Sequence, residues 1–250
     1  MKKLIALLLS IVMVLSLAAC GKDEPAKDDD EGKKKETTSQ SGNKNGDNSQ
    51  SGDDDKKDPV ITDEISVENL MNYPESPEED FVCEDYGDGV WTLTQYLGDD
   101  KIVVVPETIN GKAVEVIGSH VFAMSSPVRA VKLPDSAYKL DGFVFGANED
   151  LEIVVFGSGM REIGANERFS GPFHGCINLR EVVLNDGVET IGQLAFSGCE
   201  SLVSLDIPAS VTEIDSIAFY AAPEGFTIIG EAGSYAEQYA NENDINFQAK

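Results

Sequence analysis

Cysteine and histidine are the side chains that most often act as thiol nucleophiles, neutral-pH acid–base catalysts or zinc ligands, and this 250-residue sequence has six of them. They are Cys20, Cys83, Cys176, Cys199, His120 and His174. Neither histidine has a second histidine or a cysteine at the spacing that zinc sites use. The sequence also contains no Gly-x-Ser-x-Gly elbow and no Gly-x-x-x-x-Gly-Lys phosphate loop. It therefore predicts no catalytic residue, no metal site and no cofactor.

One short segment carries side chains that could suggest acid–base chemistry. Glu167, Arg168 and His174 lie close together in the sequence. Charged side chains are mostly exposed to solvent, so we interpret this segment as a solvated loop, with ligand contact as the alternative. We expect that the protein is not an enzyme.

Cys20 differs from the other cysteines in what precedes it. Two lysines near the start are followed by an apolar run from Leu4 to Leu17, interrupted only by two serines. This arrangement is typical of a secretory signal, and the run is shorter than the ~20 residues of a membrane-spanning helix. The run Leu17-Ala18-Ala19-Cys20-Gly21 resembles the lipobox of bacterial lipoproteins. The resemblance implies that Cys20 is lipidated and becomes the mature N-terminus; the alternative is an ordinary cleaved signal with an incidental cysteine.

Residues 21–60 have the composition of a disordered tether. They contain no aromatic residue and almost no aliphatic residue, and consist mainly of Lys, Asp, Glu, Ser, Gly, Asn and Gln. Such a segment cannot bury enough apolar surface to offset the entropy lost on ordering. A flexible coil of this length spans ~35 Å on average. It would hold a folded domain away from the membrane.

Most of the negative charge lies beyond the tether. Residues 61–250 carry 33 acidic and 9 basic side chains, which gives −24 of the chain's net charge of −26. Nucleic-acid binding needs a basic surface, so the charge excludes nucleic acid as a partner. We interpret the charge as keeping an extracellular domain soluble. The alternative is a partner that is cationic or carries Ca²⁺, although no Asp-x-Asp-x-Asp-Gly loop is present.

An internal repeat organises the second half of the chain. Four segments are apolar at their first, fourth and sixth positions and end in Pro, Gly or Asn: 128–134, 151–157, 179–185 and 202–208. Aliphatic residues, most of them followed by Gly, recur at 117, 140, 163, 191 and 214, with spacings of 23, 23, 28 and 23. The long spacing reflects five extra residues within 165–172. Each unit is too small to bury a core alone, so stacked units must share one.

The repeat resembles that of BspA-like leucine-rich-repeat proteins of bacterial surfaces. The best match is 179–219, which includes Val188-Glu-Thr-Ile-Gly-Gln-Leu-Ala-Phe-Ser-Gly-Cys199. The segments 81–117 and 233–247 resemble the hairpin that begins such domains and the helix and strand that end them. The resemblance implies a mixed β/α, mainly β, fold. It would be a single solenoid of about five 23-residue coils with an N-terminal hairpin cap and a C-terminal helix–strand cap.

These features divide the chain into four parts. They are a lipoprotein signal peptide at 1–19, the lipid anchor and disordered tether at 20–60, a lead-in segment at 61–80 and the repeat domain at 81–250. Within the lead-in, residues 65–71 are expected to form a short helix with Ser66 as its N-cap, ended by Pro74 and Pro77. The lead-in either docks on the first coil or stays mobile.

The cysteines of the repeat domain are odd in number, so at least one thiol stays free. Cys176 and Cys199 are 23 positions apart and occupy the same place in consecutive coils. Stacked coils would place equivalent atoms ~4.7–4.9 Å apart, wider than the ~3.8 Å that a disulfide needs between Cβ atoms. We therefore favour two buried thiols over a disulfide. Cys83 is expected to be half-buried in the first hairpin.

The third and fifth positions of each strand are expected to face outward. An exposed sheet face is normally polar, whereas several of these residues are apolar, which marks an interaction surface. The predicted ligand-binding strip comprises Val104, Lys132, Ile153, Val155, Glu181, Val183 and Asp206. The alternative is that the lead-in at 61–80 or a neighbouring molecule covers the strip. The insertion at 165–172 is a second candidate for ligand contact.

Together with the resemblance, these patterns predict a lipid-anchored monomer on the extracellular face of a membrane. In a host with two membranes it would be periplasmic or attached to the outer membrane. Its partners would be the membrane, through the lipid on Cys20, and an extracellular protein or glycan that it binds without catalysis. The alternative is a structural or accessory subunit of a surface assembly.

Overall fold

The computed structural model describes residues 65–124, 126–164 and 171–250. The predicted signal peptide, Cys20, the tether and most of the insertion, including Glu167 and Arg168, lie outside the described residues. No helix in the part of the chain that the structure describes is long and apolar enough to cross a membrane.

The described chain begins with a short helix and an antiparallel hairpin. Helix α2 (Val67–Asn72) starts at Ser66, whose hydroxyl accepts a hydrogen bond from the amide of Asn69 over 3.2 Å, which confirms the predicted N-cap. A 3₁₀ turn, η1 (Glu78–Asp80), leads into strand β1 (Phe81–Glu84), which pairs with β2 (Thr92–Tyr96). Because β2 pairs in parallel with the first coil, the hairpin closes one end of the stack.

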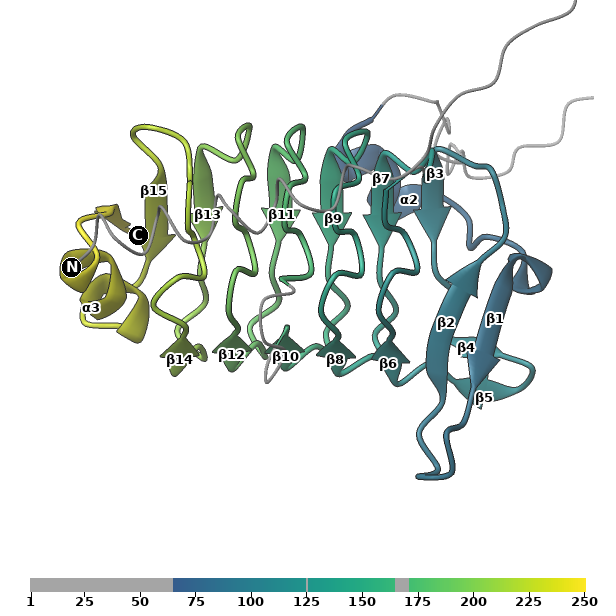
Figure 1. Cartoon of the computed structure of the whole chain (residues 1–250). Helices are drawn as coiled ribbons and strands as arrows, with labels where there is room; N and C mark the ends of the chain where they lie inside the picture. The colour runs from purple at the N-terminus through teal and green to yellow at the C-terminus, as the bar shows by residue number, and fades with distance from the viewer. Residues whose placement is uncertain (1–64, 125, 165–170) are drawn as a thin grey trace, which may run out of the picture. The chain divides into compact units, whose positions relative to one another are not determined.

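Each coil contributes a three-residue strand to one side of the solenoid and a two-residue strand to the other (Figure 1). The three-residue strands are β3 (Ile102–Val104), β7 (Ala130–Lys132), β9 (Ile153–Val155), β11 (Glu181–Val183) and β13 (Ser204–Asp206). The two-residue strands are β6 (Val116–Ile117), β8 (Lys139–Leu140), β10 (Glu162–Ile163), β12 (Thr190–Ile191) and β14 (Glu213–Ile214). A small hairpin of β4 (Thr108–Ile109) and β5 (Lys112–Ala113) projects from the first coil. It turns at Asn110 and Gly111, both at positive φ, as a tight hairpin turn requires.

The two sides of the solenoid differ in continuity. The two-residue strands and the N-terminal hairpin form one sheet in the order β1-β2-β6-β8-β10-β12-β14. The three-residue strands form a sheet in the order β11-β9-β7-β3, and β13 belongs to a separate sheet with β15 and β16. The insertion interrupts neither side, because Ile163 still pairs with Ile191 and Val155 with Val183. Among the described residues of the coils, the one break in strand pairing therefore lies between β11 and β13.

The core is a set of aligned ladders. The predicted inward positions of the described coils are buried, as in Val128, Val131 and Leu133, except for Leu184, which is half-buried. At the wide edge, five phenylalanines stack along the solenoid axis with ring centroids 5.1–5.4 Å apart and planes within 11° of parallel. They are Phe122, Phe145, Phe173, Phe196 and Phe219. The ~4.7–4.9 Å between paired strands sets this ring spacing, which lies in the favourable range for offset stacking.

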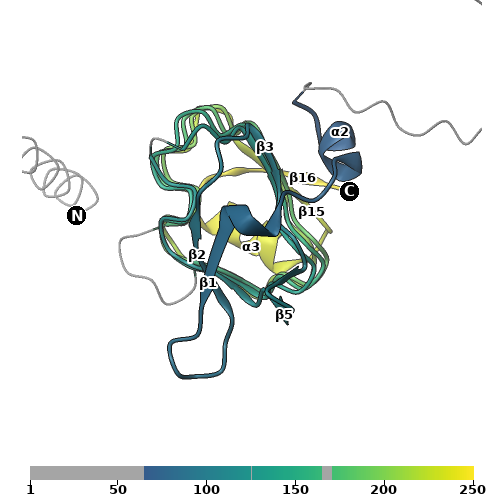
Figure 2. The ribbon, with the colours of Figure 1, turned by 90° about the vertical axis from the view of Figure 1, so that its right-hand side faces the viewer.

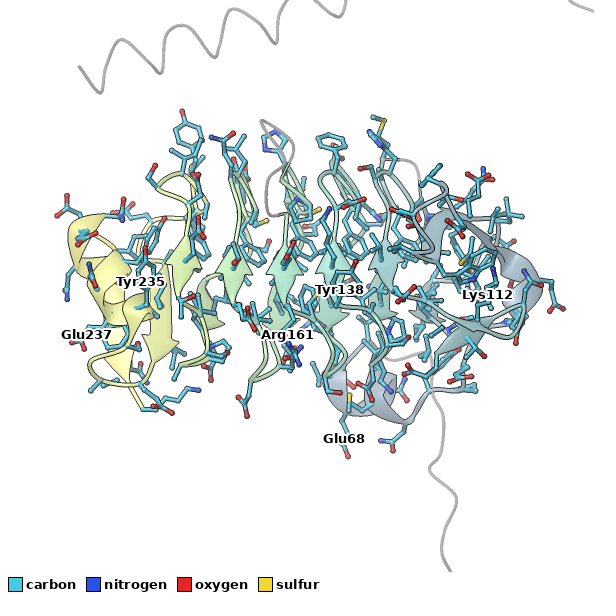
Figure 3. The ribbon with its side chains drawn as sticks, turned by 90° about the horizontal axis from the view of Figure 1, so that it is seen from below. Glu68, Lys112, Tyr138, Arg161, Tyr235 and Glu237 are labelled. Atoms are coloured by element: carbon cyan, nitrogen blue, oxygen red, sulfur yellow. The ribbon has the colours of Figure 1, made fainter. Side chains whose placement is uncertain are left out.

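The C-terminal end is closed by the helix and strand that the resemblance implied. Strand β15 (Thr227–Gly230) extends the sheet of β13, helix α3 (Tyr235–Glu242) covers the open end of the core, and β16 (Asn246–Ala249) pairs with β15. Ala236, Tyr239 and Ala240 of α3 are buried against the last coil. Figure 3 shows the two caps at opposite ends of the solenoid, with Lys112 at one end and Tyr235 and Glu237 at the other.

The described structure is the predicted mainly β leucine-rich-repeat solenoid with its two caps. The helix of the lead-in covers Val67–Asn72 instead of 65–71. Three coils place a bulky residue at positive φ in the turn before the stacked phenylalanine: His120 (φ 68°), Phe143 (φ 61°) and Leu194 (φ 56°). The sequence indicated a tight turn here but not its positive φ, because glycine, the usual residue for positive φ, is absent at these positions.

Candidate functional site

The three-residue strands have an inner and an outer face, as the sequence predicted. The middle residue of each strand, such as Val131 or Val154, points into the main core. The flanking residues form a separate cluster on the other side of the sheet: Ile102, Val104, Ala130, Ile153 and Val155. The predicted strip therefore does lie on one outer face.

Helix α2 covers the first half of that face. Leu70 is 1% exposed and belongs to the outer cluster, and Ile65, Val67 and Tyr73 pack against it. Figure 2, which looks along the stack, shows α2 outside the coils beside β3. Val104, Ile153 and Val155 are consequently at most 4% exposed. The prediction that these three residues form an open binding surface is wrong, and the alternative, cover by the lead-in, is confirmed for them.

Hydrogen bonds fix the lead-in to the first and the fourth coil. The amide of Ser76 donates to the carbonyl of Val104 over 2.9 Å, and the amide of Val104 donates to the hydroxyl of Ser76 over 3.2 Å. At the other end, the guanidinium of Arg180 donates to the carbonyl of Ile65 over 2.8 Å. A six-residue helix is not stable alone in water, so α2 depends on these contacts and on its apolar seat.

The cover ends at the fourth coil. Val183 is 37% exposed, Asp206 is exposed and Glu181 is half-buried. Lys132, which pairs with Val104 on one side and Val155 on the other, is also half-buried. The structure therefore divides the predicted strip: three apolar residues lie under α2, and Glu181, Val183 and Asp206 remain accessible.

The accessible residues line a groove at the break between β11 and β13. Its volume is about 540 Å³, within the ~300–1,000 Å³ typical of ligand sites. It is lined by Arg180, Glu181, Val182, Val183, Leu184, Asp186, Ser204, Asp206, Pro208, Ile229 and Lys250. The lining combines apolar side chains, which we call the floor of the groove, with charged side chains of both signs, which we call its walls.

Ion pairs already engage the basic groups of the groove. Arg180 lies 3.4 Å from the Glu152 carboxylate and 3.6 Å from that of Glu181. Glu152 also pairs with Arg129. Arg129, Glu152 and Arg180 each occupy the second position of their repeat segment, so they form a charged ladder over three coils. Val203, which is 63% exposed, occupies this position in the next coil and ends the ladder.

Two groove residues come from the end of the chain and were missed from the sequence. The ammonium of Lys250 lies 2.6 Å from the Asp206 carboxylate. Ile229 pairs with Asp206 across β13 and β15. The 23-residue period would have identified Ile229, which is 23 positions after Asp206 and occupies the same strand position. No sequence signal indicated Lys250, because it follows the cap and lies outside the repeat.

The three cysteines in the described part of the chain form no site for thiol chemistry. Cys176 and Cys199 are free and buried, which confirms the preference for thiols over a disulfide. Cys83 is also free and buried, so the expectation that it is half-buried is wrong. Cys176 donates to the carbonyl of Phe145 over 3.1 Å, and Cys199 donates to that of Phe173 over 3.2 Å. Burial raises the pKa of Cys83 to about 11 and that of Cys176 to about 12. Burial also raises the pKa of Cys199 well above its usual range. Thiolates are the reactive form, so these groups are structural.

His120 and His174 lie beside the turns next to the stacked phenylalanines. In the described chain, neither imidazole makes a hydrogen bond or an ion pair with an acidic or nucleophilic side chain. The rings of His120 and Phe143 lie 5.3 Å apart, and those of Phe143 and His174 lie 6.2 Å apart. Burial lowers the pKa of His174. Within the described ranges, no three His, Cys, Asp or Glu side chains are grouped in a way that could hold a metal ion.

The chain is similar to known proteins that are built from leucine-rich repeats. A family model described as "BspA type Leucine rich repeat region" matches residues 107–224 and 168–240, with six copies. No curated protein matches the chain. The crystal structure of a leucine-rich repeat protein from T. pallidum is 29% identical, with a TM-score of 0.55, covering 62% of this chain and 71% of that one. A leucine-rich repeat protein from Bacteroides capillosus is 23% identical, with a TM-score of 0.37, covering 61% of this chain and 95% of that one.

Proposed function

Because this chain belongs to the BspA-type leucine-rich repeat family, we propose that it is a lipid-anchored surface protein that recognises an extracellular ligand without catalysis. The observation that carries the proposal is the groove between β11 and β13. It is the part of the outer sheet face that α2 leaves uncovered, and it combines an apolar floor with charged walls. Solenoid repeats commonly use such continuous faces for binding.

The proposed placement on the membrane rests on the first 60 residues. Lipidation of Cys20 would hold the mature chain at the outer face of a membrane, and residues 21–60 would space the solenoid from it. A single acyl chain binds membranes only weakly, whereas two or more give stable anchoring. The lipid at a lipobox cysteine must therefore be more than one chain for this role.

The alternative of a structural subunit loses its support. That interpretation assumed that the apolar strip is buried against another protein. In the structure, α2 of the same chain buries it. The accessible remainder is small and combines polar with apolar surface, which suits a reversible contact better than a permanent interface.

Lipidation is tested with the full chain and its Cys20→Ala variant expressed in a bacterium that processes lipoproteins. The wild-type chain should yield a mature N-terminal peptide that carries lipid, detected by mass spectrometry in the membrane fraction. The variant should remain unprocessed. A processed, lipid-free form that stays on the membrane would contradict the anchor.

Recognition is tested by photo-crosslinking on the surface of the same cells. A photoreactive residue at Ser204, in the groove, should give covalent adducts with extracellular ligand. The same residue at Glu213, an exposed position on the opposite sheet, serves as the matched control. Adducts from both positions alike, or from neither, would contradict recognition through the groove.

A further inference from the structure

The groove between β11 and β13 has an apolar floor. Val183, Leu184, Pro208 and Ile229 contribute to its lining. Val183 is 37% exposed, and Val203 beside the groove is 63% exposed. Aliphatic stems of long side chains gain free energy by lying along such a surface while their charged ends stay near water.

The walls of the groove carry more negative than positive charge. Glu181, Asp186 and Asp206 face two basic residues, Arg180 and Lys250. Arg180 is shared between Glu152 and Glu181, and Lys250 is paired with Asp206. Asp186 is exposed and makes no ion pair in the described part of the chain. The groove therefore has acceptor capacity for a cation and no unengaged base for an anion.

The field around the groove has the same sign. Residues 61–250 carry a net charge of −24, which attracts cations and repels anions over about a Debye length. No aromatic side chain is among the lining residues of the groove. Its apolar surface is aliphatic, which fits methylene chains better than flat rings.

We propose that the groove binds a lysine- or arginine-bearing peptide segment of an extracellular protein partner. The methylene stems of the basic side chains lie on Val183 and Ile229, and their charged ends meet Asp186, Asp206 and Glu181. This rests on the proposed function, and it names the ligand class among the extracellular ligands considered there. The about 540 Å³ of the groove holds a few side chains and not a whole domain.

The test uses the full chain in detergent and a fluorescent peptide of alternating lysine and valine. The peptide should bind, with an affinity that falls as salt is raised. Asp186→Asn combined with Asp206→Asn should weaken binding about tenfold, because charged contacts at a partly desolvated site each contribute a few-fold. The matched control is Glu200→Gln combined with Glu213→Gln, which removes the same charge from exposed positions outside the groove and should leave the affinity within about twofold.

The outcomes separate this inference from the proposed function. If both double variants weaken binding equally, the effect comes from the overall charge of the chain and the inference is overturned. If a glutamate–valine peptide binds as well as the lysine–valine peptide, charge does not determine binding and the inference is also overturned. If the lysine–valine peptide does not bind while adducts still form at Ser204, the ligand has other chemistry; the inference fails and the proposed function stands. Binding seen only after the tether lysines at 33–35, 56 and 57 are changed to serine would assign the groove to the chain's own upstream segment and also overturn it.

Asp206→Asn also frees Lys250, so folding is checked in parallel. The Asp206–Lys250 pair is exposed, and such pairs contribute little to stability. The melting temperatures of both double variants should therefore match that of the wild-type chain. Val183→Lys provides a second test that keeps both carboxylates: a cation in the floor should repel the peptide and weaken its binding, and unchanged affinity would contradict the inference.

Discussion

Arg180 donates a hydrogen bond over 2.8 Å to the carbonyl of Ile65, a residue 115 positions earlier in the chain. This contact joins the start of the lead-in to the fourth coil, beside the groove. The same guanidinium lies against Glu152 and Glu181. Arg180 therefore connects the covered half of the outer sheet face with the accessible half.

Removing this contact should loosen the lead-in. Arg180→Ala deletes the donor to Ile65, and charged hydrogen bonds are worth roughly 1.5–3 kcal/mol before discounting for exposure. Because Arg180 is exposed, we expect faster amide hydrogen exchange in α2 with little change in the global melting temperature. Arg161→Ala removes the same charge one coil earlier and serves as the control. Equal exchange in α2 for both variants would show that Arg180 does not hold the lead-in.

The two valines of the divided strip should respond differently to a charge. Val155→Asp places a carboxylate under α2 without a partner, which we expect to cost at least about 3 kcal/mol of unfolding free energy. Val183→Asp places the same charge at a position that is 37% exposed, where substitutions usually cost less than about 0.5 kcal/mol. Denaturant unfolding of the two variants measures this difference. Equal losses would mean that α2 does not cover Val155 in solution.

The phenylalanine ladder should dominate the stability of the solenoid. Phe173 is 0% exposed and stacks on both neighbours, so Phe173→Ala should cost about 3–5 kcal/mol through the cavity that it leaves. Tyr220, next to the ladder residue Phe219 but 46% exposed, is the control, and Tyr220→Ala should cost less than about 0.5 kcal/mol. Thermal unfolding followed by circular dichroism compares them. A melting temperature of Phe173→Ala equal to the control would contradict a stacked core.

The buried thiols should make stability fall at high pH. The pKa of Cys176 in the folded chain, about 12, exceeds the usual thiol pKa of 9.0, so the folded state holds this proton more tightly than the unfolded state. The corresponding stability is complete below about pH 9 and is lost as pH rises toward 12. The wild-type chain should therefore lose more unfolding free energy between about pH 8 and pH 11 than Cys176→Ala does.

Alkylation gives a second measure of the same thiols. At about pH 8, iodoacetamide should modify Cys176 and Cys199 slowly in the folded chain and rapidly in urea, because only the thiolate reacts. Mass spectrometry of the two cysteine peptides gives the rates. Rapid modification without urea would show that these coils open readily.

The sequence by itself determined the solenoid, because its information is local and repeated. Each coil contacts chiefly its neighbours, so residues that recur every 23 positions, such as Ile191 and Ile214, can be predicted to pack on one another. In the same way, the recurrence of Phe196 and Phe219 predicts the stacked phenylalanines. The free thiols of Cys176 and Cys199 also followed, since the period alone fixes their separation. Even the outward direction of Val155 and Val183 could be predicted from alternation along a strand.

Only the tertiary structure decided what lies on the outer face. The repeat pattern describes contacts between coils and carries no information on a non-repeating segment such as α2, whose Leu70 packs beside Ile153. Nor does it contain the break between β11 and β13, because the spacing there is the ordinary 23 residues. From the sequence, the apolar strip resembled a binding surface, because burial by a distant segment of the same chain and burial by a partner both require apolar residues at the outward positions. The groove forms only in the folded chain, which brings Lys250, a residue that follows the C-terminal cap, beside residues of β11 and β13.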